Sequence, residues 1–231
     1  KVLKILKIFR QQFSLTGFEF FTDVALRYVL KQQGLQKPFE KDFPIYALVE
    51  FECPSDNERE RALEAFEECE RQSLILDGAM SQSPQQAEEF WAYRERISES
   101  LSSFKPYKSD ISVLVSQMPA FVEDCERLLG EKFSNLEFVW FGHIGDGNLH
   151  INILPRGSTE AEFRAQIEPI SHALFSLLQK YRGSLSAEHG IGLIKKPYFH
   201  YTTSKEEIEF MRSIKKIFDP DGIMNPGKIF D

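Results

Sequence analysis

The sequence predicts an α+β fold, in which a largely antiparallel sheet is covered by helices. Strand-like and helix-like patterns alternate along the 231 residues, and the pair Asp146 and Gly147 lies between two apolar runs, as in an antiparallel hairpin. Two strand, helix, strand units, at residues 18–52 and 111–141, then suggest two ferredoxin-like halves. With 42% of its residues hydrophobic, the chain can bury a sizeable core.

The first half of the chain begins with a short amphipathic helix, at residues 1–10, whose basic side chains recur every three positions. Such a helix can bind a membrane surface, but a broad apolar stripe more often docks on the chain's own core or on a neighbouring domain. Apolar and aromatic runs predict strands at residues 18–22 and 45–52. Between them, a helical pattern at residues 23–33 ends at Gly34.

A further helix is expected at residues 55–71, because Ser55 or Asp56 can cap it and its apolar positions repeat with helical spacing. A short apolar run at residues 74–76 predicts a strand. Residues 84–101 again have a helical pattern. The alternation of strands and helices therefore continues to the middle of the chain.

The second half of the chain continues this alternation. The expected strands, rich in apolar β-branched and aromatic residues, are residues 111–115, 136–141 and 149–154. The expected helices, with apolar residues three and four positions apart, are residues 120–129, 159–181 and 204–218. Gly130 is expected to end the first of these helices.

Composition excludes several classes of protein. The formal charge of −7, from 28 basic and 35 acidic residues, argues against an extended nucleic-acid interface. The three cysteines form no Cys-x-x-Cys motif, so we expect neither a disulfide framework nor a cysteine-based metal site. This cysteine usage fits a reducing, intracellular compartment best. No apolar run approaches the ~20 residues of a membrane span, and we expect no signal peptide. Because the chain begins with lysine, we expect a fragment.

The Asp146 and Gly147 turn places two histidines opposite each other. A two-residue loop has positive φ at both central positions and makes His143 face His150, with Cβ atoms about 5 Å apart. Two such imidazoles can share one cation, or they can form a cross-strand pair without metal. Asn152 lies on the same face, two residues beyond His150, and is a candidate substrate contact. The turn itself explains Asp146, and likewise Asn148, so neither is assigned as a ligand.

A second cluster lies in the glycine-rich residues 186–192. A glutamate beside a histidine, as in Glu188 and His189, is usually an ordinary surface pair. Here, however, three of the five histidines fall in two glycine-rich segments, where the glycines suggest a close approach of the backbone to a ligand. His143, His150 and Glu188 would form a two-histidine, one-carboxylate metal set with open positions. His189 would then be free to act as a base.

Three motifs, at residues 141–150, 187–192 and 218–228, resemble the C-terminal, substrate-binding half of the FAD-linked 2-hydroxyacid dehydrogenases. These are the D-lactate dehydrogenase, glycolate oxidase and D-2-hydroxyglutarate dehydrogenase group of the vanillyl-alcohol oxidase superfamily. The resemblance implies that residues 1–231 are the substrate- and metal-binding C-terminal domain of an FAD-linked oxidase. It also implies that FAD is bound mainly by an N-terminal domain absent from this chain, to which residues 219–231 return.

The resemblance also implies roles for the two histidine clusters. In this family two histidines and a glutamate, matching His143, His150 and Glu188, hold a divalent metal that is usually zinc. The catalytic histidine matches His189, which takes the hydroxyl proton while hydride passes from the substrate α-carbon to flavin N5. The tail asparagine near the isoalloxazine matches Asn225, although a turn alone also explains that residue. Asn225 and Glu188 are therefore expected as cofactor contacts.

Substrate-binding residues follow from the same resemblance. An arginine and a hydroxyl residue four positions later bind the substrate carboxylate in this family and match Arg94 and Ser98, where relatives often have threonine. A spacing of four places both on one face of a helix. Lys108 matches a substrate-binding lysine further along. Without the resemblance, these side chains would be interpreted as ordinary solvated groups.

Together these features imply the substrate-binding part of a flavin-dependent enzyme that oxidises a D-2-hydroxy acid, of the lactate, glycolate or 2-hydroxyglutarate type, to the 2-oxo acid. The chain alone is expected to be inactive, and its compartment cytoplasmic, peripheral at a membrane, or mitochondrial in a eukaryote. A metal-dependent hydrolase and a non-catalytic subunit of a flavoprotein complex are the alternatives. The sequence leaves the hydroxy acid, the electron acceptor, the metal and any homo-oligomer open.

Overall fold

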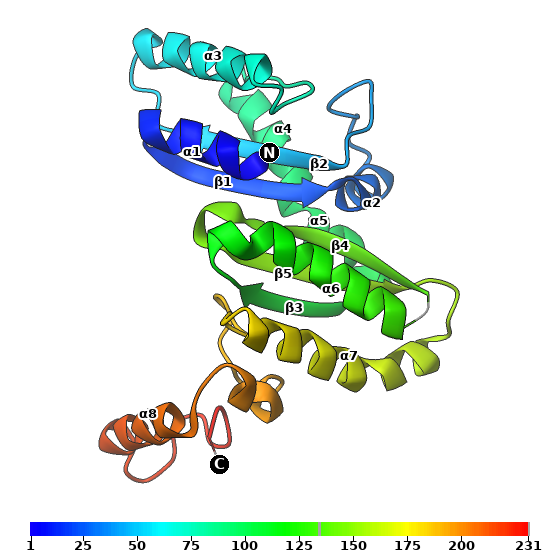
Figure 1. Cartoon of the computed structure of the whole chain (residues 1–231), viewed down its shortest axis with the longest axis vertical. Coiled ribbons are helices and arrows are strands. Elements are labelled where there is room, and N and C mark those ends of the chain that lie inside the picture. The colour runs from blue at the N-terminus through cyan, green and yellow to red at the C-terminus, as the bar shows by residue number, and fades with distance from the viewer. Residues whose placement is uncertain (134, 231) are drawn as a thin grey trace. The chain divides into compact units, whose positions relative to one another are not determined.

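The computed structural model describes residues 1–133 and 135–230, without the side chain of residue 33 (Figure 1). Helices and strands alternate through most of the chain. In order they are α1 (Val2–Gln12), β1 (Leu15–Thr22), α2 (Asp23–Gln33), β2 (Ile45–Phe51), α3 (Asp56–Arg71), α4 (Pro84–Glu95), α5 (Ile97–Leu101), β3 (Tyr107–Ser112), α6 (Met118–Lys132), β4 (Leu136–His143), β5 (Asn148–Pro155), α7 (Glu160–Lys180) and α8 (Lys205–Phe218). None of the described helices is both long and apolar enough to span a bilayer.

Within the described residues the strands form a five-stranded sheet in the order β2-β1-β4-β5-β3. The pairs β1–β2, β1–β4 and β3–β5 are antiparallel, which confirms the predicted α+β class with helices covering an antiparallel sheet. The chain groups into two compact units. Unit 1 comprises residues 1–106 and 139–146, and unit 2 comprises residues 107–138 and 147–231.

Unit 1 is built around β1, which pairs with β2 on one side and with β4 on the other. Helices α1, α2 and α4 pack against β1, and α1 also contacts α3. The helix α2 has the predicted bounds and ends at Gly34, whose φ of 65° fits a left-handed cap. Its Leu26 and Val29 are buried, together with Phe18 and Phe20 of β1. Burial of each such side chain stabilises the fold by about 1.5–3 kcal/mol.

Unit 2 has an apolar core on one face of the β3–β5 pair. Alternate residues of these strands, Ile111, Leu149, Ile151 and Ile153, are fully buried. Helices α6 and α7 pack on each other and contribute their own buried apolar side chains, which are Phe121, Cys125, Leu129, Ile170, Leu174 and Leu178. Because side chains alternate along a strand, the opposite face of β3 and β5 remains available for polar residues.

Several predicted elements differ from the structure. Residues 74–76 are not a strand, since Leu74 is buried but Leu76 is exposed and this segment pairs with no described strand. The predicted helix at residues 84–101 is divided at Arg96 into α4 and α5. The helix α6 continues through Gly130 to Lys132, because Gly130 does not adopt the left-handed conformation that would end it.

The strand β3 begins earlier than predicted, at Tyr107, and ends at Ser112. Residues beyond it leave the strand, and Val115–Gln117 form a 3-10 turn that leads into α6. The pairing partner explains the shift, because β3 follows β5 in register from Tyr107 opposite Ile153 to Ser112 opposite Asn148. The extent of β3 is therefore set by its neighbour rather than by its own apolar residues.

The predicted two-residue turn is wrong. Ile144–Asp146 form a 3-10 turn, and of the two predicted central residues only Gly147 has positive φ, at 73°. Glycine is required there because a Cβ atom would lie 2.2 Å from the carbonyl oxygen of Val113. The derivation of the His143 and His150 register from that turn therefore fails, and the sharing of one cation by the two imidazoles stays a prediction.

Candidate active site

The polar face of unit 2 is formed by alternate residues of β3 and β5. The two strands place Lys108 opposite Asn152, Asp110 opposite His150 and Ser112 opposite Asn148. Since directly opposite residues of an antiparallel pair point to the same side, these six side chains share one face. This is the face opposite the apolar core of the unit. We call these six residues the polar face.

Asp110 connects the polar face to the loop that carries Glu188 and His189. Its side chain is 2% exposed. One carboxylate oxygen, Oδ2, accepts hydrogen bonds from the backbone N–H groups of Glu188, at 2.9 Å, and of His189, at 3.0 Å. The Lys195 ammonium donates to the main-chain oxygen of Asp110 at 2.9 Å. Asp110 thus ties the loop to β3 through both its side chain and its main chain.

The charges around Asp110 are mutually supporting. Burial disfavours its ionised form, but the two N–H donors together with His189 and Lys195 outweigh that cost, and the pKa of Asp110 lies below its ordinary value. Burial lowers the pKa of Lys195, and the nearby Asp110 carboxylate opposes that change. Asp110 is therefore an ionised carboxylate at neutral pH.

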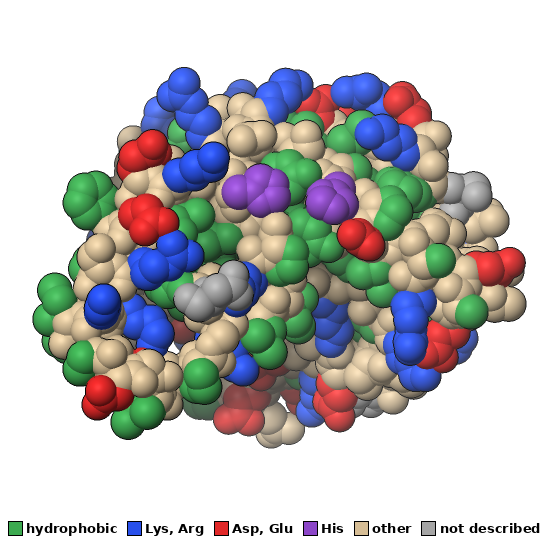
Figure 2. Space-filling view, turned by 90° about the horizontal axis from the view of Figure 1, so that it is seen from below, with side chains coloured by type: hydrophobic (Ala, Val, Ile, Leu, Met, Phe, Trp, Pro, Cys, Tyr) green, Lys and Arg blue, Asp and Glu red, His purple; other side chains and the backbone are tan. Residues whose placement is uncertain are grey.

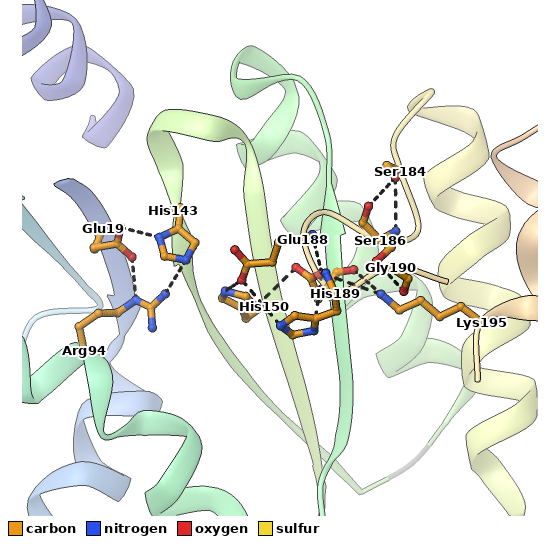
Figure 3. A network of polar contacts seen from close by, with 11 residues as sticks. Glu19, Arg94, His143, His150, Ser184, Ser186, Glu188, His189, Gly190 and Lys195 are labelled. Carbon is orange, nitrogen blue, oxygen red and sulfur yellow. Dashed lines mark hydrogen bonds and ion pairs between the residues drawn. The ribbon is translucent and has the colours of Figure 1, made fainter. Parts of the chain in front are cut away.

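Around this carboxylate, the structure brings three of the predicted residues of unit 2 together (Figure 3). His150 directs Nε2 towards a Glu188 carboxylate oxygen, at 3.5 Å, and Nδ1 towards Asp110 Oδ1, at 3.7 Å. The His189 ring stacks on His150 with centroids 6.0 Å apart, and its Nδ1 lies 3.6 Å from Asp110 Oδ2. The half-buried His150 therefore lies next to an exposed glutamate and an exposed second histidine.

The loop that carries Glu188 and His189 has no regular secondary structure. Ser184 anchors its start through a β-bridge to Ser112, and the Ser186 hydroxyl closes it by donating to the carbonyl of Gly190 at 2.9 Å. Just before the bridge, a Cβ atom on Gly183 would lie 2.4 Å from the carbonyl oxygen of Ser112. Only glycine permits this approach of loop and strand.

His143, in unit 1, is held by a separate group of charged side chains. Glu19 lies opposite it on β1, and His143 Nδ1 donates to Glu19 Oε1 at 2.7 Å. Arg94 donates to the other Glu19 oxygen at 2.9 Å, and one of its terminal nitrogens lies 3.4 Å from His143 Nε2 (Figure 3). The guanidinium also stacks over Phe141 at 4.7 Å. Glu19 and Arg94 are both buried, so they form a buried ion pair beside His143.

The remaining predicted site residues lie in more exposed places. Ser98 is exposed on α5, whereas the buried Arg94 belongs to α4, so the continuous helix assumed for this pair is wrong. Lys108 is an exposed member of the polar face. Asn225 lies in the exposed tail with a left-handed φ of 46°. The roles of these residues in binding substrate or cofactor stay predictions.

Three buried oxygens of the polar face have no hydrogen-bond partner among the described residues. They are the Oδ1 atoms of Asp110, Asn148 and Asn152. A buried polar atom left unpaired costs about 1–3 kcal/mol, and in native proteins it usually has a ligand or water as its partner. Asn148 and Asn152 flank His150 along β5, whereas Asp110 Oδ1 faces His150 Nδ1, so the two asparagine oxygens fit a polar ligand better than a dry core.

Sequence reasoning missed Glu19, Asp110 and Asn148. A signal existed for the first, because Glu19 is a single charge between the aromatic residues of an apolar strand. For Asp110 the signal was its position two residues after Lys108, which places both on one strand face. Asn148 was attributed to the turn, but its side chain is buried on the polar face.

Comparisons with known proteins find relatives that match nearly the whole chain. The chain is 49% identical over 230 residues to a D-2-hydroxyglutarate dehydrogenase of Stutzerimonas stutzeri, covering 99% of this chain and 50% of the relative. It is 46% identical to a D-2-hydroxyglutarate dehydrogenase of Xanthomonas citri pv. viticola, covering 100% and 49%. A putative mitochondrial D-lactate dehydrogenase of Schizosaccharomyces pombe is 35% identical, with 93% and 42% covered. The chain thus spans about half the length of these relatives.

The comparison of folds also finds a structure of much lower sequence identity. An alkyldihydroxyacetonephosphate synthase structure matches with a TM-score of 0.58 at 14% identity, covering 97% of this chain and 41% of that chain. At this identity the likeness concerns the fold alone. The family profile described as FAD linked oxidases, C-terminal domain, matches residues 1–229. This chain therefore belongs to the FAD linked oxidase family, of which it carries the C-terminal domain.

Proposed function

We propose that this chain is the substrate-binding part of an FAD-dependent dehydrogenase that oxidises a D-2-hydroxy acid to the 2-oxo acid. The observation that carries the proposal is the polar face, where the buried unpaired oxygens of Asn148 and Asn152 lie on the same strand face as His150, which is beside Glu188 and His189. The names of the relatives support the substrate class, and 2-hydroxyglutarate is the form that the two most similar of those described above suggest.

His143, His150 and Glu188 are proposed to hold one divalent cation. Each offers one suitable ligand atom, and two imidazoles with one carboxylate form a donor set that suits zinc while leaving a position open for substrate. The approach of His150 Nε2 to Glu188 within unit 2 supports two of the three ligands. His143 is joined to His150 by only six residues. A bound cation would supply Lewis acidity to the substrate hydroxyl.

Residues of this chain would bind the acid and move its proton. Lys108 and Asn152, opposite each other on β3 and β5, present a cation and an amide to a carboxylate. Arg94 and Ser98 are proposed as a further carboxylate contact. His189, exposed beside His150, would take the hydroxyl proton as the C–H bond breaks, the C=O bond forms and the hydride passes to flavin. No net charge then remains on the product carbonyl.

FAD itself is proposed to be bound mainly by the part of the protein that relatives have beyond this chain. The tail, residues 219–231, and Asn225 would contact that part. The helix α8 supports this role, because its apolar residues Phe210, Ile217 and Phe218 are strongly exposed. Figure 2 shows one face of the molecule, on which hydrophobic side chains lie among charged ones. Burying such a surface against a second domain would stabilise both.

Dye reduction tests the proposed reaction. We expect the full-length protein to reduce an artificial electron acceptor with D-2-hydroxyglutarate, D-lactate or glycolate, and residues 1–231 alone to give no turnover, since this chain would lack the hydride acceptor. Turnover by residues 1–231 alone would contradict the half-enzyme proposal. Ester or amide hydrolysis in place of dye reduction would instead favour a metal-dependent hydrolase.

Elemental analysis tests the metal set. We expect wild type to bind about one zinc, and His143→Ala and His150→Ala each to lose most of it, because removing one of three protein ligands leaves an incomplete set. His200→Ala is the matched control, since His200 is an exposed histidine outside the site, in a tilted ring contact with Tyr201. Equal zinc content in all four proteins would rule out the proposed set.

A further inference from the structure

We propose that Asp110 is the positioning residue of this site: one buried carboxylate that orients the His150 ring and also fixes the backbone of Glu188 and His189. Nothing in the family resemblance or the comparisons assigns this residue. The inference rests on the proposed function only in that it takes His150 and Glu188 as metal ligands. Asp110 itself contacts neither substrate nor metal in this proposal.

The first part of the inference concerns the two ring nitrogens of His150. Nδ1 faces Asp110 Oδ1 at 3.7 Å, whereas Nε2 faces Glu188 at 3.5 Å. Asp110 Oδ1 is buried and has no hydrogen-bond partner among the described residues, so it is available to the Nδ1 proton after a small ring rotation. A carboxylate that holds the proton on one imidazole nitrogen leaves the other nitrogen free to bind a metal.

The second part concerns the loop. Asp110 Oδ2 accepts hydrogen bonds from two consecutive backbone N–H groups, those of Glu188 and His189, which are 78 and 79 residues away in the sequence. Two adjacent donors on one oxygen fix the peptide orientation at this point of a loop that lacks regular structure. The side chains of Glu188 and His189 therefore start from fixed backbone positions, although both are exposed. Without this anchor, a loop ligand and a base would each have to be ordered at a cost in conformational entropy.

Unit 1 contains an independent instance of the same arrangement. Glu19 is a buried carboxylate that lies opposite His143 on the neighbouring strand, and it accepts a hydrogen bond from His143 Nδ1 at 2.7 Å. In each unit, then, a strand histidine has a buried acid on the paired strand at its Nδ1 side. A purely structural histidine does not require a buried charge, whose desolvation is costly.

The substitution Asp110→Asn tests the inference, because the amide preserves the shape and one acceptor but removes the charge. Asp219→Asn is a closely matched control. Asp219 is likewise a buried aspartate that accepts two consecutive backbone N–H groups, from Ile223 and Met224, and it also faces a lysine, Lys215. Both variants lose a buried carboxylate that holds a loop, but only one lies beside the proposed ligands.

We expect Asp110→Asn in the full-length protein to lower zinc affinity about 10–100-fold and to shift the visible spectrum of the Co²⁺-substituted protein, because second-shell partners of metal-bound histidines have effects of this size. Asp219→Asn should lower the unfolding midpoint without changing either reading. If wild type binds metal and Asp110→Asn binds it with the same affinity and spectrum, the inference is overturned.

A second measurement on metal-free wild type needs no variant. At a pH where the imidazoles are neutral, ¹⁵N NMR reports which ring nitrogen carries the proton. We expect His150 to be protonated on Nδ1, and an Nε2 proton there would overturn the inference. This measurement distinguishes failure of the proposed metal set from failure of the role of Asp110. If wild type binds no metal but His150 carries its proton on Nδ1, the metal set is refuted, whereas the orienting role of Asp110 is supported.

Discussion

Replacing Arg94 by methionine is expected to destabilise the protein by about 3–5 kcal/mol, because it leaves the Glu19 carboxylate buried without its guanidinium partner. The Arg94 and Glu19 side chains are only 10% and 5% exposed, and their atoms lie 2.9 Å apart. Methionine fills a similar space, so the loss is mainly electrostatic. Denaturant unfolding followed by circular dichroism would measure the change in the free energy of unfolding.

The control for this prediction is Arg27→Met, since Arg27 forms a surface pair with Asp23 at 3.1 Å. Solvent screens such a pair, and its loss should cost less than about 1 kcal/mol. The double variant Arg94→Met with Glu19→Met should recover part of the lost stability, because no uncompensated charge remains. An Arg94→Met protein as stable as Arg27→Met would show that the buried pair is not strongly coupled.

Replacing His189 by glutamine is expected to lower kcat for the 2-hydroxy acid by about 10²–10⁴-fold, the usual size of a general-base contribution. His189 is exposed, so the free energy of unfolding should change by less than about 0.5 kcal/mol. The zinc content should also remain that of wild type, because His189 is not one of the proposed ligands. Steady-state dye reduction by the full-length protein measures the effect.

His172→Gln is a suitable comparison for His189→Gln. His172 lies on α7, is also exposed, and contacts Tyr201 and Tyr198 rather than the polar face. It should therefore leave kcat unchanged. If His189→Gln and His172→Gln have the same kcat, the base is another residue. If His189→Gln loses zinc as well as activity, His189 acts as a ligand, and the separation of roles between Glu188 and His189 is wrong.

The sequence was most informative where local interactions define an element. The helix α8 begins at the predicted place because Ser204 and Glu207 form a capping box, and α7 begins in the same way with Thr159 and Glu162. Gly34 ends α2 in a left-handed conformation that other residues rarely adopt. These signals involve residues within one turn of each other, so they do not depend on the rest of the fold.

Errors occurred where a partner far along the chain sets the structure. The bounds of β3 follow the pairing with β5, so the strand takes in the polar residues 108–110 and leaves out part of the apolar run predicted at residues 111–115. Residues 74–76 are apolar but have no described strand to pair with. The turn before β5 is shaped by the close approach of Gly147 to Val113. A pattern of apolar residues indicates that a segment can be a strand, but hydrogen-bond partners decide whether it is one.

The same distinction between local and distant interactions applies to the candidate site. Motifs alone identified His143, His150, Glu188 and His189 as the chemical groups, and in unit 2 the last three lie around one carboxylate. Neither Glu19 nor Asp110 belongs to a motif with the histidine it faces. Which acid faces which histidine depends on strand register, and a single sequence specifies that register only weakly.

The sequence by itself determined the fold class, most helix and strand positions, and the residues that could bind a metal and move a proton. Only the tertiary structure decided how those residues are oriented: Glu19 at the Nδ1 side of His143, and Asp110 facing His150 Nδ1 while receiving the backbone of Glu188 and His189. The physical reason is that residue type fixes what a group can do chemically. The orientation of its side chain depends on buried charged residues from distant parts of the chain. Such charges hold a side chain in one orientation because the interior has a low dielectric constant.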